Sequence, residues 1–265
     1  MNKIRIVNDI PEIVSLNDSI EFTVLEKNEL FSVNSLKIRV KKSTSLEIEY
    51  QSIETTKLDI FINVEENVKF NLFEFREGNN NKIQYKYYLE ENSKSNITKF
   101  YNVSNIKEMI IVNLNGKKAE FNYNFKTISV SEEKYDMIVY HNYSNTISNI
   151  KNNGVNILDG VLTFNVSGFI LNNKKDCVLN QNNRIINLTN NKCQITPNLF
   201  IDDNNVDANH SALIGKFSDE EIFYLQRLGI DETIATNLLI KGFLLSDIKK
   251  SKQSKIIKII DQYWR

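Results

Sequence analysis

Apolar residues recur at every second position through most of the first two hundred residues, and this period constrains the fold more than any other feature of the chain. Successive side chains of a β-strand point to opposite faces, so a two-residue period predicts strands with one face toward a core. No helical window of comparable strength separates these segments. The period is clear in seven of them, at 36–40, 46–50, 58–64, 68–72, 83–89, 121–125 and 162–166.

A chain of many short strands can form a sandwich, a barrel or a β-solenoid. Two features favour the solenoid. The strands continue for about 200 residues, more than a simple sandwich of the immunoglobulin type usually holds, and asparagines recur in the expected connections, where successive coils would stack like residues on each other. No strict repeat is visible, so the pattern by itself leaves the three architectures open.

Asparagine is expected to replace glycine in the turns, because the chain has only 8 Gly and 2 Pro. Asparagine tolerates the left-handed backbone region and forms hydrogen bonds with its own chain. We therefore predict that the asparagine-rich stretches 77–82, 113–118, 150–156 and 179–184 close turns.

Helical signals begin after Gly215. Ser218 and Glu221 form a capping box, and Gly229 is suited to end the helix that follows. Asp231 can cap a second helix, in which Ala235 and Gly242 would share a face that another backbone approaches closely. A third helix is predicted near 254–265, and we expect the lysines of this region, 249, 250, 252, 255 and 258, to form a solvated face.

The sequence therefore predicts a mainly β domain at 1–214 and a small α-helical domain at 215–265. Helices this short are not stable alone, so they must pack on the β domain, on each other or on a partner. Their abundant apolar side chains favour a contact with a partner protein.

Composition excludes several classes of function. The formal net charge is +0, which removes the simplest electrostatic case for nucleic acid or an anionic membrane as partner. The first residues contain no long apolar run, so we expect neither a secretion signal nor a membrane span. Cys177 and Cys193 do not make a disulfide framework, and we expect a cytoplasmic protein in which both are buried as small hydrophobes.

The segment 197–243 resembles the C-terminal region of the SufB/SufD family, the scaffold proteins of the SUF iron–sulfur cluster assembly system. Weaker similarity extends upstream, at 62–74, 141–150, 162–170 and 181–188. The positions that match the family pattern are Pro197, Leu199, Ile201, Val206, His210, Ala212, Gly215, Phe223, Tyr224, Leu225, Gly229, Ile230, Ala235, Leu239, Ile240, Gly242 and Phe243.

The resemblance implies a right-handed parallel β-helix with a C-terminal helical domain. It also implies a non-catalytic scaffold that pairs through its β-helix with a SufB-like paralogue or a second copy of itself. Family members usually carry a long N-terminal helical region, so the chain is expected to be a short form. The family's SufB-type cysteine would fall at Asn191, which makes the chain SufD-like.

The resemblance further implies that the helical domain docks a SufC-like ABC ATPase. No cofactor is expected to be permanently bound, but a transient iron–sulfur cluster would form at a subunit interface, with His210 as a metal contact. Arginine usually precedes the family's Gly-Ile turn, whereas Leu228 stands there in this chain and Arg227 one position earlier. The residues expected to contact the ATPase are Phe223, Tyr224, Arg227, Gly229, Ile230, Ala235, Leu239, Gly242 and Phe243.

Other interpretations remain open for each site. His210 can instead be a turn residue hydrogen-bonded to Asp202, Asp203 or Asp207, and His141 is expected to be structural. The three aspartates could belong to a β-helical carbohydrate-active enzyme, although they lack the spacing of a calcium loop. No phosphate-binding loop or nucleophile triad is apparent, so we expect no enzymatic activity. A degenerate homodimeric scaffold without cluster ligands is the remaining alternative.

Overall fold

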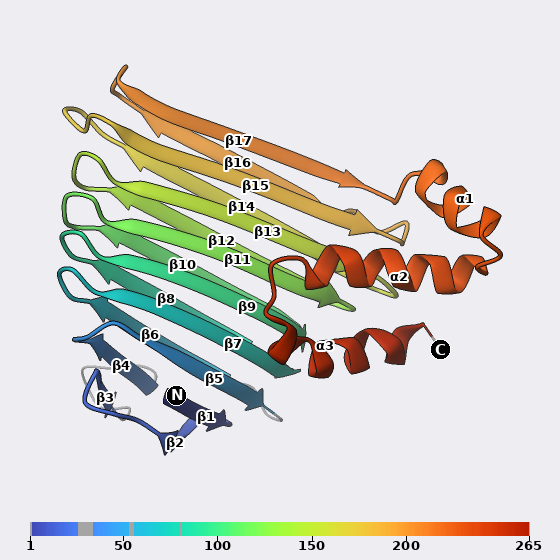
Figure 1. Cartoon of the computed structure of the whole chain (residues 1–265), viewed down its shortest axis with the longest axis horizontal. Coiled ribbons are helices and arrows are strands. Elements are labelled where there is room, and N and C mark those ends of the chain that lie inside the picture. Colours follow the sequence, from blue (N-terminus) through green and yellow to red (C-terminus); the bar gives the residue numbers. More distant parts are fainter. Residues whose placement is uncertain (1, 26–33, 53–55, 80, 265) are drawn as a thin grey trace.

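The computed structural model describes residues 2–25, 34–52, 56–79 and 81–264, and its strands form two facing sheets (Figure 1). Sheet A has the order β17-β15-β13-β11-β9-β7-β5-β1-β2, and sheet B has the order β16-β14-β12-β10-β8-β6-β4-β3. The strands of sheet A are β1 (Asn2–Val7), β2 (Ile10–Ser15), β5 (Thr44–Ser52), β7 (Lys69–Asn79), β9 (Lys94–Ser104), β11 (Glu120–Ser129), β13 (Ile147–Asn156), β15 (Cys177–Asn187) and β17 (Val206–Gly215). Those of sheet B are β3 (Ile20–Leu25), β4 (Asn34–Val40), β6 (Thr56–Val64), β8 (Asn81–Leu89), β10 (Ile106–Leu114), β12 (Glu132–His141), β14 (Val161–Ile170) and β16 (Gln194–Ile201).

From β4 onward the chain alternates between the sheets, and each strand pairs in parallel with the strand two positions later. This is a parallel β-solenoid, so the predicted β-helix is confirmed, and the sandwich and the barrel are not formed. At the N-terminal end the pattern changes, because β2 and β3 are antiparallel to β1 and β4. The two antiparallel strands terminate the stack at this end.

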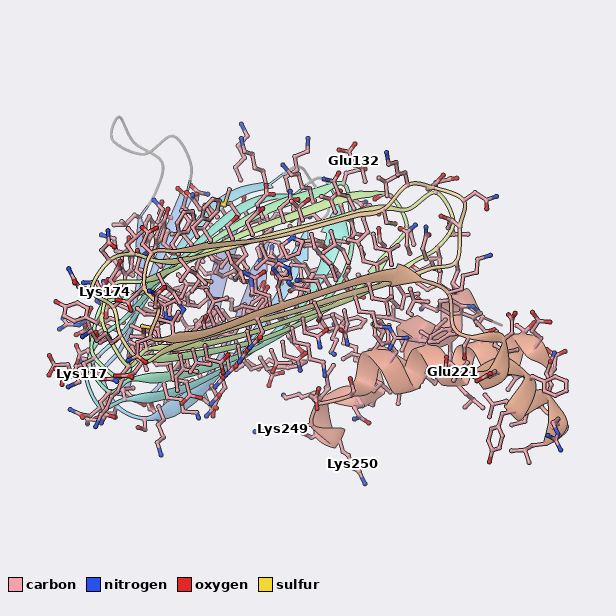
Figure 2. All side chains as sticks on the ribbon, turned by 90° about the horizontal axis from the view of Figure 1, so that it is seen from above. Lys117, Glu132, Lys174, Glu221, Lys249 and Lys250 are labelled. Carbon is pink, nitrogen blue, oxygen red and sulfur yellow. The ribbon has the colours of Figure 1, made fainter. Side chains whose placement is uncertain are left out.

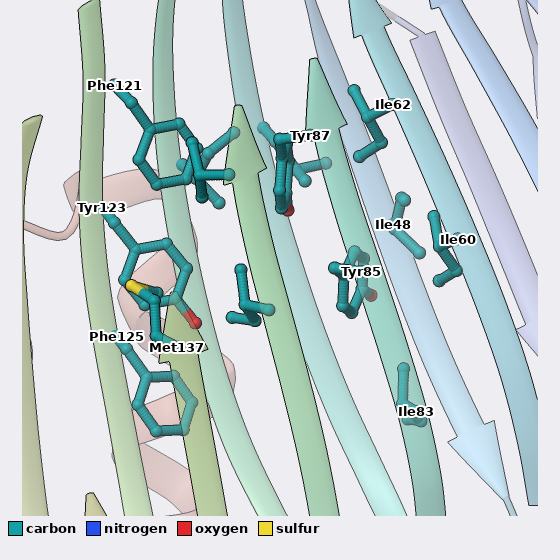
Figure 3. Packing of buried hydrophobic residues seen from close by; sticks show 14 of the residues in the cluster. Ile48, Ile60, Ile62, Ile83, Tyr85, Tyr87, Phe121, Tyr123, Phe125 and Met137 are labelled. Atoms are coloured by element: carbon teal, nitrogen blue, oxygen red, sulfur yellow. The ribbon is translucent and has the colours of Figure 1, made fainter. Parts of the chain in front are cut away.

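The core lies between the two sheets, as the two-residue period predicted. The apolar residues that alternate in the seven predicted segments are all buried. Aromatic rings fill the centre, where Phe121, Tyr123 and Phe125 follow one another along β11 (Figure 3). Tyr87 of the opposite sheet meets Phe121 with ring centroids 5.2 Å apart. Aromatic pairs at this distance add to the stabilisation that burial provides.

A row of six asparagines crosses the outer face of sheet A, the face turned away from the core. The side-chain amide of each asparagine after the first donates to the amide oxygen of the asparagine one coil earlier, at 2.8–3.3 Å, and the first, Asn71, donates to the Ser45 hydroxyl. Neighbours in this asparagine row are 25 to 31 residues apart in the sequence, and this variable coil length explains why no strict repeat is visible. The row consists of Asn71, Asn96, Asn122, Asn149, Asn180 and Asn209.

The prediction that asparagine closes the turns is correct in part. Asn67, Asn92 and Asn145 have positive φ in turns, where glycine would otherwise be favoured. The stretches 77–82 and 113–118 do span turns, although Asn80 lies outside the described residues and Lys118 has the positive φ in the second turn. The prediction is wrong for 150–156 and 179–184, which lie inside β13 and β15. There the amides bond from coil to coil, as Asn152 does with Asn183 at 2.7 Å.

Three helices follow β17: α1 (Asp219–Arg227), α2 (Glu232–Leu245) and α3 (Lys250–Tyr263). The predicted capping box is present, since the Ser218 hydroxyl accepts from the Glu221 amide and the Glu221 carboxylate accepts from the Ser218 amide. Asp231 caps α2 by accepting from the Thr233 amide at 2.8 Å. Gly229 has φ +80, the left-handed conformation expected just after a helix.

Helices α2 and α3 pack against the outer face of sheet A near one end of its strands (Figures 1 and 2). Buried apolar residues of both partners form the contact, among them Ile128 and Val155 from the sheet and Ile240, Leu244 and Ile260 from the helices. Burial of apolar side chains of this size stabilises by about 1.5–3 kcal/mol each. The helical segment is therefore fixed to the solenoid.

Two expectations for the helices hold only in part. Lys249, Lys250, Lys255 and Lys258 are exposed, as expected, but Lys252 is half-buried and pairs with Glu47 of β5, and Lys255 also lies 2.9 Å from Glu77 of β7. No backbone of the described chain approaches Gly242, since a methyl group placed on it would meet nothing within 4 Å. Gly242 is exposed, whereas Ala235 is buried, so the two residues do not share a packed face.

Candidate functional site

His210 lies at the open C-terminal end of the solenoid. It belongs to β17, where it is in register with Gln181 of β15. Gln181 is buried and points into the solenoid, because its amide donates to the Asn198 carbonyl of the opposite sheet at 3.3 Å. His210 occupies the next position of this inward-facing row and is exposed, since no further described coil covers it.

The nearby aspartates do not hold His210. Within the described ranges, no hydrogen bond joins its ring to Asp202, Asp203 or Asp207. Asp203 accepts from the Asn205 amide at 3.0 Å, and Asp207 accepts from the Asn209 side chain at 2.7 Å. The imidazole is therefore free to meet a ligand or a second protein. Among the described residues, no three His, Cys, Asp or Glu side chains lie together in a group that could hold a metal ion.

The strands at this end expose apolar side chains. β16 and β17 are the last strands of their sheets, so each has one edge without a neighbouring strand in the described part of the chain. Leu213 and Ile214 of β17 are 54% and 41% exposed, and Phe200 of β16 is 48% exposed. Phe200 continues a stack in which its ring centroid lies 4.5 Å from that of Phe169. Such an edge can pair with another sheet, because its backbone groups and its apolar surface are both available.

The remaining histidine and the two cysteines are buried. His141 has both ring nitrogens occupied, at 2.8 Å from the hydroxyls of Thr146 and Ser148, and burial lowers its pKa to about 4. His141 is structural, as expected. Cys177 and Cys193 are free thiols in buried positions, and burial raises the pKa of Cys193. A buried thiol whose pKa is raised, as at Cys193, is a poor ligand and a poor nucleophile.

A second exposed surface is formed by α1 and the start of α2. No residue of α1 is buried, and Phe223, Tyr224 and Leu228 are 59–64% exposed. A groove of about 450 Å³ runs beside them and is lined by Asp219, Glu220, Ile222, Phe223, Gln226 and Glu232. Exposed apolar and aromatic side chains rimmed by polar residues are typical of a protein-binding surface.

The residues expected to contact an ATPase divide into two groups. Phe223, Tyr224, Arg227, Gly229 and Gly242 are exposed. Ile230, Leu239 and Phe243 are half-buried, and Ala235 is fully buried. Leu239 and Phe243 pack against the buried apolar residues at the contact between the helices and sheet A, so they hold the helices on the solenoid.

A buried charged cluster between the sheets was missed by the sequence reasoning. Arg76 donates to Glu74 at 2.8 Å, and its guanidinium lies 3.6 Å from the centre of the Tyr50 ring. Lys99 donates to Glu108 at 3.1 Å and lies 3.4 Å from the Tyr85 ring centre. The sequence could have indicated part of this cluster. Glu74 and Arg76 continue the series of every second residue that begins with Phe70 and Leu72 in β7, and this series faces the core.

This cluster balances two cations against two carboxylates. Tyr101 links them, since its hydroxyl lies 2.9 Å from Glu74 and 2.6 Å from Glu108. Burial alone would raise the pKa of Glu74, but Lys99 and Arg76 outweigh it and hold that pKa at about 2. Buried ion pairs cost desolvation and add little net stability, yet removal of one partner leaves an unpaired buried charge. The cluster therefore links β7, β9 and β10 through contacts whose loss would leave a charge buried without a partner.

Within the described part of the chain, no helix has both the length and the apolar character needed to cross a membrane.

Comparison with known proteins agrees with this architecture. The family model described as "SUF system FeS cluster assembly, SufBD core domain" matches residues 23–243. An iron–sulfur cluster assembly SufBD family protein of Mycobacterium leprae is 43% identical over 70 residues, which are 26% of this chain and 18% of that protein. A SufBD family protein of Pyrococcus horikoshii is 43% identical over 58 residues, 21% of this chain and 13% of the relative. The matched segments span less than a fifth of the length of either relative. Because the family model covers most of this chain, the chain belongs to the SufBD family of iron–sulfur cluster assembly scaffolds.

Proposed function

We propose that this protein is a SufD-like, non-catalytic subunit of a SufBCD-type assembly complex. It binds a SufC-like ABC ATPase through its helical segment, and it pairs through the open end of its solenoid with a SufB-like paralogue or a second copy of itself. The observation that carries the proposal is the exposure of α1, a helix without a buried residue that is joined to helices fixed on sheet A.

The ATPase contact is tested by co-purification of the full chain with an ABC-type ATPase of the SUF system. We expect Phe223→Asp together with Tyr224→Asp to abolish the complex, because a charge is placed on two exposed aromatic side chains. The matched control is Ile10→Asp with Ile13→Asp on β2, where both isoleucines are exposed at the opposite end of the molecule. Equal complex formation by both double variants would contradict the proposed docking surface.

The second proposed role concerns the nascent cluster, which is the cargo of the complex. His210 offers a free imidazole, and histidine is a known if less common cluster ligand. Because the described residues of this chain supply no complete metal site, the other ligands would come from the paired subunit. Cysteine is absent from position 191, in agreement with a SufD-like role.

Anaerobic cluster reconstitution on the paired complex tests this role. His210→Ala is expected to lower the yield of cluster, whereas Ser211→Ala, also exposed and next in the same strand, is expected to leave it unchanged. An unchanged yield with both variants would favour the alternative of a homodimeric scaffold without cluster ligands. The mass of the complex in solution separates a homodimer from a heterodimer.

Force can pass from the ATPase to the cluster by a direct route. A movement of α1 acts on α2, which is held on sheet A by the apolar contact with Ile128 and Val155. Lys151 of β13 also pairs with Asp247, between α2 and α3, at 2.6 Å. Both contacts end in strands that lead toward β15 and β17, so a rigid stack would carry the displacement to the open end.

A further inference from the structure

Four lysines form a row on the outer face of sheet B. They occupy equivalent positions on four successive parallel strands, and no described helix covers them. Neighbouring strands are about 4.8 Å apart, so the row extends about 14 Å along the solenoid axis. The lysine row consists of Lys57, Lys82, Lys107 and Lys134.

The charge of this row is only partly balanced. Lys134 lies 3.1 Å from Asp136, and Lys107 lies 4.0 Å from the exposed Glu132. Among the described residues, no carboxylate lies within ion-pair distance of Lys57 or Lys82. Two unit charges at the strand spacing repel by about 1 kcal/mol in water. The row therefore presents a linear positive charge on a chain whose net charge is zero.

A groove of about 510 Å³ lies along the row. Its floor includes Asp59, Gln84, Met109 and Asp136, which follow the lysines by two positions on the same four strands. The floor thus carries an acidic residue near each end and uncharged side chains between them. A ligand that fits must present negative charge along one line and hydrogen-bond donors or positive charge beside it.

These features distinguish between three kinds of polyanion. Single-stranded nucleic acid needs aromatic side chains on which bases stack, and none of the described residues that line the groove is aromatic. The carboxylates of Asp59 and Asp136 would also repel phosphates. In an extended peptide, residues on the same side are about 6.7 Å apart, so four of them span about 20 Å, which is longer than the lysine row. An α-helix with acidic residues three or four positions apart advances about 5.4 Å per step, or about 16 Å in three steps.

We propose that the lysine row binds the acidic face of an α-helix from a partner protein, laid along the solenoid axis. The carboxylates of that helix meet the four ammonium groups, and basic residues on its flank meet Asp59 and Asp136. The flexible lysine side chains absorb the small difference in spacing. The surface lies on the sheet opposite the helical segment, so it can be occupied while an ATPase is bound to α1.

Two synthetic helical peptides of equal composition test the proposal. One carries glutamates at positions i, i+4, i+7 and i+11 with lysines on the flank, and the other spreads the same residues around the helix. We expect the first peptide to bind the full-length protein at least about ten-fold more tightly by fluorescence anisotropy, with an affinity that falls as salt rises. Replacement of Lys57, Lys82, Lys107 and Lys134 by glutamine should remove this difference.

The matched control replaces Lys117, Lys175, Lys249 and Lys250 by glutamine, which removes four exposed charges outside the lysine row. Figure 2 shows Lys117, Lys249 and Lys250. This control variant should retain the preference for the first peptide. The proposal would be overturned if both peptides bound the unchanged protein equally well, or if the control variant lost the preference for the first peptide as the row variant does. Either result would mean that the lysines attract anions only by their overall charge. Tighter binding of a single-stranded oligonucleotide that is lost with the row would also overturn the proposal. If the four-fold variant fails to fold, the single change Lys82→Glu gives the same comparison.

Discussion

Sheets A and B have the same parallel backbone, but their outer faces have different surroundings. On sheet A, six asparagines bond to one another from coil to coil, and α2 and α3 cover the neighbouring strand ends. On sheet B, lysines occupy equivalent positions on four strands, and no described helix covers them.

The difference shows how the chemistry of a repeated side chain decides the role of a face. An amide is both donor and acceptor, so a row of asparagines satisfies itself within the solenoid. An ammonium group only donates, so a row of lysines remains incomplete and needs anions from outside. We expect substitutions on sheet A to affect stability and those on sheet B to affect binding.

The largest effect is expected where the helices meet sheet A. Ile260→Ala should lower the free energy of unfolding by about 2–5 kcal/mol, because a fully buried side chain is removed from the contact. The same change at Ile111, half-buried on the outer face of sheet B, should cost clearly less. Urea denaturation of the two variants measures the difference. Equal losses would mean that the two faces are energetically alike.

A pH-dependent effect is expected from Lys126, a residue of sheet A buried beneath the helical segment and 3.3 Å from Ser246. Burial, aided by the nearby charge of Lys151, lowers the pKa of Lys126 to about 7. Between that value and about 10.5 the unfolded chain binds a proton that the folded chain does not, so stability should rise with pH, by at most about 1.4 kcal/mol per pH unit.

The variant Lys126→Met should lose this rise. Unfolding measured at several pH values between about 7 and 10 provides the test. A variant whose pH profile parallels that of the unchanged protein would show that the Lys126 ammonium is not desolvated by the helices.

Loss of one amide from the asparagine row should have a moderate effect. Asn122→Ala removes the bonds that Asn122 makes to Asn96 at 3.0 Å and to Asn149 at 2.8 Å, and we expect a loss of about 1–2 kcal/mol. Asn113→Ala on sheet B removes only a 3.5 Å contact with the Tyr87 carbonyl and should cost less. Thermal unfolding compares them, and a larger loss for Asn113→Ala would argue against the row as a stabilising feature.

The smallest effects should differ in sign between the faces. Lys252→Gln removes the ion pair with Glu47 that links α3 to sheet A, and we expect it to lower stability by about 0.5–1 kcal/mol. Lys82→Gln should raise stability by a few tenths of a kcal/mol at low salt, because it relieves repulsion from Lys57 and Lys107. The gain should vanish at high salt, and a loss at low salt would contradict the electrostatic account of the lysine row.

The helical signals could be interpreted reliably because each depends on neighbouring residues. Ser218 with Glu221, Asp231 and Gly229 perform the roles predicted for them. The asparagines of 150–156 and 179–184 were placed wrongly in turns, because their local preference for turns is outweighed by bonds such as that from Asn152 to Asn183, 31 residues away.

The candidate sites were less predictable. The motif around His210 marks this residue as a candidate site, but it does not predict that the side chain is exposed. The exposure depends on the place of His210 in the last coil. The charged cluster of Glu74, Arg76, Lys99 and Glu108 joins residues up to 34 positions apart, so no short window contains it.

The sequence by itself determined which residues face the core and where α1 and α2 begin, because side-chain alternation and capping act over two to four positions. It did not determine the start of α3, which has no side-chain cap and begins at Lys250 rather than near 254. Only the tertiary structure decided which strands pair, and therefore which side chains form rows. Coil lengths vary between 25 and 31 residues along the asparagine row, so the register follows from packing between distant segments and cannot be counted along the chain. The lysine row, the buried charged cluster and the free imidazole of His210 all depend on that register.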